Sequence, residues 1–333
     1  MHRDDGETMR VMRIDGDGAM RLEVRPAPSP GPEEVQVRVR AAGVNRGDIL
    51  QRKGLYPAPP GVVPDVPGLE YAGEVVRCGA RVRGVAVGDR VMGLVAGGGY
   101  GEQVVAHHRT LIPIPEDIGF TDAAAIPEAF VTAYDALVLQ AGLMPGQRVL
   151  IHAAGSGVGT AAVQLVSAWG ATAIGTSRTP EKLVAAEALG LQRGIVPEAG
   201  TFANAVRAAG AVDVVLDLVG GAYTAESVRC MTSGGCLMLV GLVGGIKCDM
   251  PLTVLLKRRI RVQGTVLRSR PLEEKIAVAR SFCRHVLPLF GGSRPRLRPV
   301  VAGVHPMSAV DAAHGHMRAN TLNGKLVLTW DGC

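Results

Sequence analysis

The chain is poor in aromatic residues and in paired cysteines, and each shortage excludes a class of function. Phenylalanine, tyrosine and tryptophan make up 4% of its 333 residues. Proteins that stack on nucleic-acid bases use aromatic side chains, so this composition argues against that mode of binding. The six cysteines include no C-x-x-C pair, so the sequence indicates neither a disulfide framework nor a zinc knuckle. We therefore expect a reducing, cytoplasmic location.

The chain also lacks the apolar segments that would take it to or through a membrane. Its start, MHRDDGETMR, is charged and is not a secretory signal. We expect residues 1–8 to be a disordered extension, with Met9 as the natural start. The stretch 149–177 contains no Asp, Glu, Lys or Arg, but glycines interrupt it. Its pattern fits strand, turn, helix and strand better than a membrane span, and we expect no membrane partner.

The net charge of +6 raises the question of a polyanionic partner. The basic residues are scattered, apart from short runs at 257–259 and 294–298. This distribution does not favour nucleic acid as the main partner. A small ligand rich in phosphate accounts for part of the excess charge.

Two different sequence patterns along the chain predict two domains. Residues 9–115 are β-rich, with expected strands at 35–40, 71–77, 90–95 and 103–106 between Gly and Pro turns. A helix is expected at 121–141. Strands and helices then alternate from Arg148, which predicts a parallel sheet with helices on both faces. The tail, with a helix at 272–287 and strands at 298–301 and 325–329, is too small to fold alone. We assign residues 1–125 and 270–333 to one domain and 126–269 to an inserted dinucleotide-binding domain.

The segment 149–165 carries the clearest chemical signal. A buried strand runs into a glycine-rich turn and then a helix, whose free N–H groups and dipole suit a pyrophosphate. Against the G-x-G-x-x-G fingerprint the frame is Ala154-x-Ser156-x-x-Gly159, so only the last glycine matches. The alternative is a plain strand–helix turn, which the flanking βαβ pattern disfavours.

The end of the next strand predicts the choice of dinucleotide. NAD-binding proteins place an acid there for the ribose hydroxyls, but this chain has Ser177 and Arg178, with Lys182 one helical turn later. A hydroxyl and two cations suit a 2′-phosphate, which favours NADP(H). Alternatively, Arg178 and Lys182 are solvated residues at the start of a helix.

Seven stretches together resemble a known superfamily over nearly the whole chain. They are NRGDILQRKGLYPAPPG (45–61), PGLEYAGEV (67–75), AAAIPEAFVTAYDAL (123–137), IHAAGSGVGTAAVQL (151–165), GLVGG (241–245), TVLRSR (265–270) and NGKLVL (323–328). The pattern resembles the medium-chain dehydrogenase/reductase superfamily. Within it, the sequence is most similar to the zinc-free quinone oxidoreductase branch, especially its p53-inducible, zeta-crystallin-like members.

The resemblance implies an α/β protein with a GroES-like β-barrel catalytic domain beside a Rossmann domain, forming a homodimer through the edge strands of the Rossmann sheets. It also implies hydride transfer from NADPH to a small quinone or enone. The residues that it places near the acceptor are Asn45, Asp48, Tyr56 and Thr132, with Glu128 on the same helix as Thr132. The residues that it places on the cofactor are Ala154, Gly155, Ser156, Gly157, Val158, Gly159, Ser177, Arg178, Lys182, Gly241, Leu242, Val243, Val266, Leu267, Arg268, Asn323 and Lys325.

The chain departs from the zinc-dependent relatives at two positions where they carry metal ligands. Where they have a cysteine and a Gly-His-Glu, this chain has Asn45 and Gly68-Leu69-Glu70. Without a Lewis acid, alcohol oxidation loses its means of stabilising an alkoxide. Reduction of an electrophilic quinone or enone needs no metal. Relatives often carry Tyr or His near position 197. Here Pro197 either weakens NADPH binding or leaves more of the binding of the adenosine phosphate to Arg178.

Each pocket residue has a structural alternative. Asn45 could cap a helix, Asp48 could pair with Arg46 or Arg52, and Tyr56 could be a packed loop aromatic. No general acid is evident in the sequence.

Five of the eight histidines are candidate metal ligands, but they lack ligand spacing and are expected on the surface. They are His107, His108, His305, His314 and His316.

Two other functions remain open. One is reduction of an enone or enoyl thioester on the same scaffold. The other is a non-catalytic NADPH-binding protein with a stress or structural role.

Overall fold

The structure is a computed structural model that describes residues 7–292 and 296–330. The chain divides into two compact units. The first unit comprises Met1–Glu128, Arg268–Pro295 and Pro299–Cys333, and the second comprises Ala129–Leu267 and Arg296–Arg298. The sequence-based boundaries, after residue 125 and before residue 270, did not include the short return of 296–298 to the second unit.

The second unit is built on a six-stranded sheet in which every neighbouring pair is parallel. Its strands are β8 (Arg148–Ile151), β9 (Thr172–Thr176), β10 (Leu191–Ile195), β11 (Val212–Asp217), β12 (Met231–Leu239) and β13 (Arg261–Gly264). The spatial order is β10-β9-β8-β11-β12-β13, which is the Rossmann order 3-2-1-4-5-6. The order reverses between β8 and β11, so a ligand crevice is expected at the carboxyl ends of these two strands.

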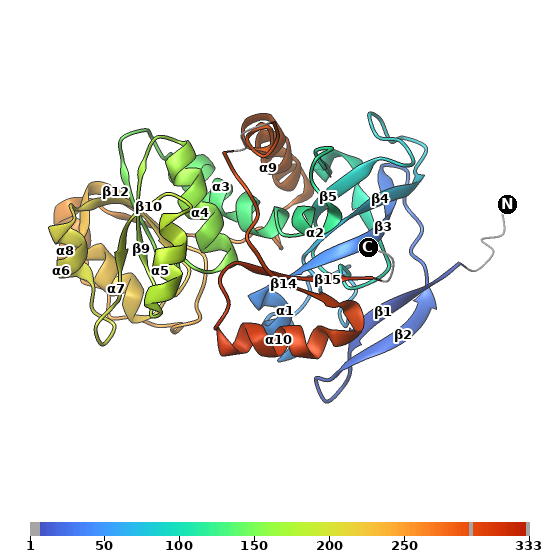
Figure 1. The fold of residues 1–333 in the computed structure, drawn as a ribbon, viewed down its shortest axis with the longest axis horizontal. Coiled ribbons are helices and arrows are strands. Elements are labelled where there is room, and N and C mark those ends of the chain that lie inside the picture. The colour runs from blue at the N-terminus through green and yellow to red at the C-terminus, as the bar shows by residue number, and fades with distance from the viewer. Residues whose placement is uncertain (1–6, 293–295, 331–333) are drawn as a thin grey trace. The chain divides into compact units, whose positions relative to one another are not determined.

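Helices cover both faces of this sheet (Figure 1). They are α4 (Gly157–Ala168) and α5 (Pro180–Glu187) on one face, and α6 (Ala203–Ala208), α7 (Ala222–Val228) and α8 (Leu252–Arg258) on the other. Leu150, Val215 and Leu237 from adjacent strands are fully buried against the second group of helices. Each such aliphatic side chain contributes roughly 1.5–3 kcal/mol through burial, which explains why apolar runs in the sequence located these strands.

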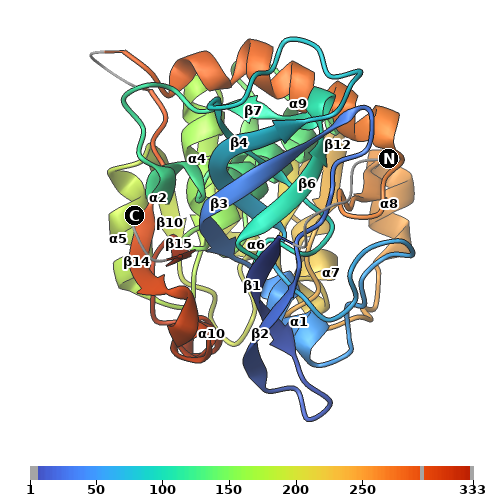
Figure 2. The same cartoon turned by 90° about the vertical axis from the view of Figure 1, so that its right-hand side faces the viewer.

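The first unit holds a mainly antiparallel sheet of seven strands and a separate hairpin (Figure 2). The sheet strands are β3 (Glu34–Val44), β4 (Glu70–Cys78), β5 (Arg90–Leu94), β6 (Gln103–His107), β7 (Ile112–Pro113), β14 (Val301–Pro306) and β15 (Lys325–Thr329). The sheet order is β14-β15-β3-β4-β5-β7, and β6 pairs with one end of β3. β15 pairs antiparallel with the other end of β3, so the last strand of the described chain lies beside one of the first.

Short helices connect and flank the strands of the first unit. They are α1 (Arg46–Arg52), α2 (Phe120–Ala123), α9 (Leu272–His285) and α10 (Val310–Ala319). The sequence predicted a single helix over 121–141, and this was wrong in detail. Helix α2 ends at Ala123, and the chain re-enters helix through two π-helical segments, Pro127–Val131 and Asp135–Gln140, around α3 (Thr132–Tyr134). Pro127 has no N–H to donate to the preceding turn, which accounts for the break.

Two other expectations needed correction. The expected extension included residues 7 and 8, but Thr8 begins β1 (Thr8–Ile14), which pairs with β2 (Met20–Pro26). Residues 1–6 lie outside the described part. The expected strand at 298–301 is found later in the chain, as β14. In the described part of the chain, no helix is long and apolar enough to cross a bilayer.

Candidate active site

A buried ammonium group is the centre of a polar cluster in the first unit. Lys325, the first residue of β15, is 5% exposed. Its Nζ donates to the carbonyl oxygen of Val44 at 3.1 Å, to Oδ1 of Asn45 at 2.5 Å and to Oε1 of Glu70 at 2.5 Å. Three N–H groups therefore meet three protein acceptors. The cofactor role expected for Lys325 stays a prediction, and in the described structure its ammonium donates to protein acceptors.

Glu70, the first residue of β4, accepts hydrogen bonds on both of its carboxylate oxygens. Its Oε1 also accepts from the amide of Asn45 at 2.9 Å, and its Oε2 accepts from the backbone N–H of Glu128 at 2.7 Å. The neighbouring β3 makes room for the carboxylate at Gly43, where a Cβ would lie only 2.1 Å from Oε1. Glycine is required there by contact, and its backbone needs no unusual conformation.

The Asn45 side chain makes several hydrogen bonds inside the cluster. Its Oδ1 accepts from Lys325, and its Nδ2 donates to Glu70 and to the carbonyl oxygen of Gly43 at 3.3 Å. Asn45 stands at the N-cap of α1 and forms a capping box with Asp48, as the helix-cap alternative expected. In this box, Oδ2 of Asp48 accepts from the Asn45 N–H at 2.7 Å. The contact of Asn45 with substrate stays a prediction.

Asp48 is fully buried and also committed to internal partners. Besides the Asn45 N–H, it accepts from the Gly68 N–H at 3.0 Å and from the Tyr100 hydroxyl at 3.0 Å. Burial raises the pKa of Asp48 to about 6, against the lowering effect of these hydrogen bonds. The alternative pairing with Arg46 or Arg52 does not occur. The arginines bond instead to the carbonyl of Met317 and to Asp311, respectively.

Tyr100 connects Asp48 to a histidine that the sequence placed on the surface. His314 in α10 is 0% exposed, so that expectation was wrong. Because the Tyr100 hydroxyl donates to Asp48, it accepts from Nε2 of His314 at 3.2 Å. Nδ1 of His314 then faces a guanidinium nitrogen of Arg52 at 3.5 Å. Burial lowers the pKa of His314 to about 4, so the ring is neutral near neutral pH.

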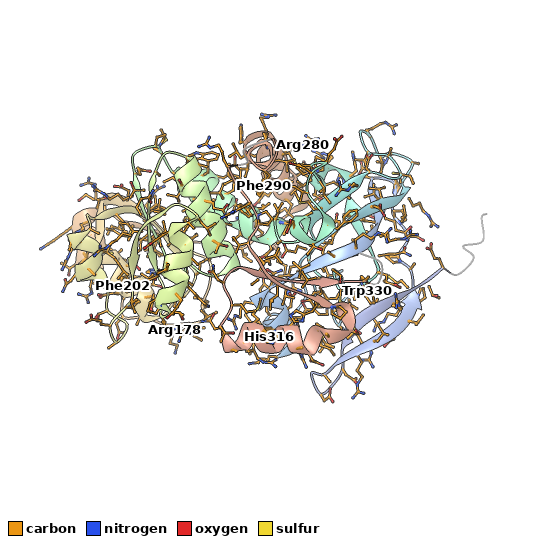
Figure 3. The ribbon with its side chains drawn as sticks, viewed as in Figure 1. Arg178, Phe202, Arg280, Phe290, His316 and Trp330 are labelled. Carbon is orange, nitrogen blue, oxygen red and sulfur yellow. The ribbon has the colours of Figure 1, made fainter. Side chains whose placement is uncertain are left out.

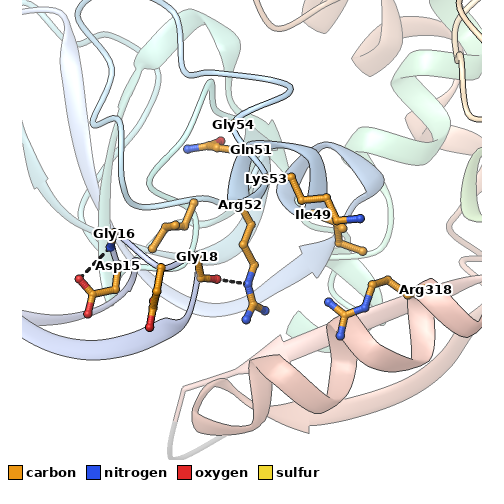
Figure 4. A pocket seen from close by; sticks show the side chains of 11 residues that line it. Asp15, Gly16, Gly18, Ile49, Gln51, Arg52, Lys53, Gly54 and Arg318 are labelled. Atoms are coloured by element: carbon orange, nitrogen blue, oxygen red, sulfur yellow. Dashed lines mark hydrogen bonds between the residues drawn. The ribbon is translucent and has the colours of Figure 1, made fainter.

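Arg52 also borders a hollow of about 680 Å³ in the first unit (Figure 4). Its guanidinium bonds to the carbonyl of Gly18 and to Asp311. Arg318 lines the same hollow. The row of side chains from Arg52 through His314 and Tyr100 thus leads from this hollow to Asp48.

Arg268 fastens the segment that carries Tyr56. Its guanidinium lies 4.6 Å from the centre of the Tyr56 ring and donates to the carbonyl oxygens of Tyr56 at 3.0 Å and Ala96 at 2.6 Å. A further bond reaches Oε1 of Gln51 at 2.5 Å. Arg268 is 8% exposed, and its guanidinium holds the loop of Tyr56 in place. The cofactor role expected from the sequence stays a prediction. Burial and the nearby charge of Glu128 raise the pKa of Tyr56.

The glycine-rich turn of the second unit has the close packing that a dinucleotide loop needs. A Cβ on Gly159 would lie 2.3 Å from the carbonyl oxygen of Ala153, so only glycine allows helix α4 to approach the end of β8. Ser156 is the N-cap, and its hydroxyl oxygen accepts from the Gly159 N–H at 3.1 Å. The N–H groups of Gly157 and Val158 precede the first intrahelical bonds and stay open to an anion.

Two cations come together near the end of β9. Arg178 is exposed (Figure 3) and forms no ion pair within the described residues. Lys182 is 7% exposed, and burial, followed by repulsion from Arg178, lowers its pKa. The Ser177 hydroxyl oxygen accepts from the Thr179 N–H at 3.1 Å. Like charges held together in this way are stabilised by an anion placed between them.

The loop after β11 lines the same carboxyl edge of the sheet. Asp217 is buried, and its Oδ1 accepts from the N–H groups of Val219 and Gly220 at 2.9 and 2.8 Å. This loop pairs with the 241–245 segment through a parallel bridge between Gly220 and Gly245. The predicted residues Leu242 and Val243 are 49% and 60% exposed there.

The structure thus separates the predicted residues into two groups. Asn45, Asp48, Tyr56, Arg268 and Lys325 gather in the first unit. Asn323 also belongs to that unit, and its Oδ1 is buried without a hydrogen-bond partner. The second unit carries Thr132, the residues 154–159, Ser177, Arg178, Lys182, 241–243, Val266 and Leu267.

Comparison with known proteins gives the family. The family described as "Alcohol dehydrogenase GroES-like domain" matches residues 31–116, and that described as "Zinc-binding dehydrogenase" matches residues 157–282. Quinone oxidoreductase-like protein 2 of Bos taurus is 31% identical over 291 residues, which cover 86% of this chain and 82% of that protein. The chain belongs to the medium-chain dehydrogenase/reductase superfamily. It is therefore an oxidoreductase of a family that binds a nicotinamide cofactor, and the expected GroES-like and Rossmann fold is confirmed.

Other members of the superfamily differ in their reactions. The quinone oxidoreductase of Thermus thermophilus, also determined in complex with NADPH, is 32% identical, with a TM-score of 0.81 over 96% of this chain and 100% of that one. CurK enoyl reductase is 26% identical, with a TM-score of 0.85 over 97% and 99%. The spectinabilin polyketide synthase system protein NorB of Streptomyces orinoci is 37% identical over 306 residues. This covers 88% of the chain but only 13% of NorB.

The superfamily implies a nicotinamide dinucleotide and, in some members, a zinc ion. The residues of this chain fit the first and not the second. The Gly159 contact and the Arg178–Lys182 pair fit a phosphorylated dinucleotide, which supplies a hydride when bound. Around Lys325, an amide, a carboxylate and an ammonium do not fit the cysteine, histidine and carboxylate ligands that zinc prefers. No cluster of three or more His, Cys, Asp or Glu side chains suited to a metal occurs in the described ranges.

Proposed function

We propose that this enzyme is an NADPH-dependent reductase of quinones or similarly activated acceptors and works without a metal ion. The observation that carries the proposal is the Lys325 ammonium between Asn45 and Glu70. Asn45 stands where the zinc-dependent relatives that this chain resembles place a metal-ligating cysteine, and Leu69, beside Glu70, stands where they place a histidine. An ammonium with all its donors committed cannot polarise a substrate as a Lewis acid does. The acceptor must therefore be electrophilic by itself, as quinones and enones are.

The preference for NADPH rests on Arg178 and Lys182. An exposed guanidinium and a buried ammonium, both following the second strand of the sheet, favour a 2′-phosphate over a bare ribose hydroxyl. The end of β9 carries no acid that would repel such a phosphate.

A second candidate is reduction of an enone or enoyl thioester. The similarity to CurK enoyl reductase and to a polyketide synthase protein favours it. The hydride chemistry is the same, and the acceptor differs in receiving the hydride at a carbon conjugated to a carbonyl.

The enzyme is further proposed to act as a homodimer through the β13 edge of the second unit. Leu252 and Leu256 of α8 are 70% and 80% exposed, and Val262 of β13 is 40% exposed. An edge strand flanked by exposed leucines is suited to pairing with the same edge of a second copy.

A panel of acceptors tests the reaction. NADPH oxidation is measured with ortho- and para-quinones, simple enones and an enoyl thioester, each repeated with NADH and after exhaustive chelation. We expect quinone reduction with NADPH, unchanged by chelation, and no stoichiometric zinc by elemental analysis. One tightly bound zinc per chain, or turnover of an alcohol instead of a quinone, would reject the proposal.

A further inference from the structure

Reduction of a quinone or enone consumes a proton as well as a hydride, and the polar cluster contains few groups able to give one. The three N–H groups of Lys325 donate to Val44, Asn45 and Glu70. The amide of Asn45 donates to Glu70 and Gly43. Neither side chain has a proton free for a substrate.

The carboxylates of Glu70 and Asp48 also have all their hydrogen-bond partners within the protein. Glu70 receives hydrogen bonds on Oε1 from Lys325 and Asn45, and on Oε2 from the Glu128 N–H. Asp48 receives bonds from two backbone N–H groups and from Tyr100, and it is fully buried. Every oxygen of these two carboxyl groups therefore already accepts a hydrogen bond from the protein. The cluster is left with two possible donors, Glu128 and Tyr56.

Glu128 has an anchored backbone and a carboxyl group that no described residue binds by a hydrogen bond. The bond from its backbone N–H to Glu70 fixes the residue in the π-helical turn Pro127–Val131, and such turns often mark functional sites. Its side chain is partly exposed and makes no hydrogen bond within the described residues, whereas every other carboxyl group in the cluster does.

Charged groups from four parts of the first unit act electrostatically on the Glu128 carboxyl group. Glu70 of β4 and Asp48 of α1 are acidic, Lys325 of β15 and Arg268 are basic, and Tyr56 interacts from its loop. Burial, followed by the charge of Glu70, raises the pKa of Glu128 to about 8. The group is therefore mostly protonated at neutral pH. The pKa of Tyr56 is raised as well, which makes its phenol a weaker acid than usual.

We propose that the carboxyl group of Glu128 is the proton donor of the reductase reaction, an inference that rests on the proposed function. The acceptor takes up one hydride and becomes an anion, at oxygen for a quinone or as an enolate for an enone. The O–H bond of Glu128 breaks as its proton passes to that anion, giving the hydroquinone or the saturated ketone. The Glu128 carboxylate then regains a proton from water, so atoms and charge balance over the cycle.

The kinetic test compares Glu128→Gln with Glu116→Gln, an exposed glutamate of the same unit. With an enone acceptor, kcat of Glu128→Gln should fall by about 10²-fold or more, since general acids contribute about 10²–10⁴-fold. The rate of the unaltered enzyme should decline as pH rises through about 8, and this decline should be lost in Glu128→Gln. N-methylphenazinium, a cation that becomes neutral on hydride uptake, needs no proton, so both variants should reduce it at the unaltered rate.

A spectroscopic readout needs no turnover. In cofactor-free protein, the infrared difference between about pH 6 and about pH 10 should contain the carbonyl stretch of a protonated carboxyl group titrating near pH 8. The band should persist in Glu116→Gln and disappear in Glu128→Gln. Unchanged enone reduction by Glu128→Gln, or its loss in Tyr56→Phe instead, would overturn the inference while leaving the proposed function intact. Failure of the unaltered enzyme to oxidise NADPH with any acceptor would overturn the proposed function itself.

Discussion

The ammonium nitrogen of Lys325 lies 2.5 Å from Oδ1 of Asn45 and 2.5 Å from Oε1 of Glu70, and this contact organises the polar cluster of the first unit. A cation built into the protein thus stands between the two side chains. It neutralises the buried carboxylate of Glu70, which is 0% exposed. Because this cation is the side chain of Lys325, dialysis or chelation does not remove it as it would a bound metal ion, and only mutation does.

Replacing Lys325 should be costly for stability. Lys325→Met keeps much of the side-chain volume but leaves Glu70 charged, buried and without its cation. Breaking one partner of a buried pair costs about 3–5 kcal/mol, and we expect a loss of this size in urea unfolding. Lys53→Met, at an exposed lysine of the same unit, is the control. Adding Glu70→Gln to Lys325→Met should restore part of the loss. Additive losses would show that the pair is not coupled.

Replacing Arg178 should change cofactor choice. A charged hydrogen bond contributes roughly 1.5–3 kcal/mol, so Arg178→Ala should lower NADPH affinity about 10- to 100-fold. NADH lacks the 2′-phosphate and should be little affected. Lys182→Ala should act in the same direction but less, because an ammonium makes no bidentate contact.

The measurement is kcat/KM for both cofactors in each variant, with Arg193→Ala, an exposed arginine of β10, as the matched control. Equal use of NADH and NADPH by the unaltered enzyme would contradict the assignment.

The buried histidine His314 should make the protein sensitive to mild acid. Its pKa is about 4 in the folded state against an ordinary 6.5. Above about pH 6.5 the ring is neutral in both states and has no effect on stability. As pH falls from about 6.5 to about 4, the unfolded chain binds a proton that the folded chain rejects, so the free energy of unfolding decreases. Asp48, with its pKa raised to about 6, acts in the opposite direction below that pH.

Urea unfolding at about pH 7 and about pH 5 tests this prediction. From about pH 6.5 to about pH 5, His314 alone should remove about 2 kcal/mol. We expect His314→Asn to show a smaller loss between the two pH values than the unaltered protein, and the exposed His316→Asn to behave as the unaltered protein does. An identical loss in all three proteins would locate the acid sensitivity elsewhere, for example at His152, whose pKa burial also lowers to about 4.

The exposed leucines of α8 should decide assembly. Leu256→Glu places a charge on a side chain that is 80% exposed, so it should not disturb an isolated chain. If this edge joins two copies, the variant should be monomeric at concentrations where the unaltered protein is a dimer, measured by analytical ultracentrifugation. Val184→Glu, on an exposed valine of α5 that is 65% exposed, should leave the dimer unchanged.

The parallel sheet could be predicted because its central strands are short apolar runs, buried on both faces and separated by glycine turns. The edge strand β13 could not, since it is exposed along its whole length and shows no apolar pattern. The first hairpin had a signal that was not used. Asp15, Gly16, Asp17 and Gly18 form a turn sequence between two runs of alternating apolar and arginine residues.

The cluster of the first unit was predicted as a set of residues, but its contacts were not. Asn45, Asp48 and Lys325 were all named, yet no sequence rule pairs Lys325 with a carboxylate 255 positions earlier. The burial of His314 could have been found. Val310, Ala313, His314 and Met317 follow the spacing of the buried stripe of a helix, and the first three are buried in α10.

The position of Lys325 at the start of the last described strand has a consequence for biosynthesis. During translation, β3 and β4 emerge long before β15, which alone brings the cation to Glu70. Until then the emerging chain holds a carboxylate whose neutralising partner has not yet been made, and the edge of β3 that β15 will occupy is open. The arrival of β15 closes that edge and neutralises that charge in one late step. Ribosome-bound chains that lack β15 should therefore remain partly folded, in a state that chaperones and proteases can recognise.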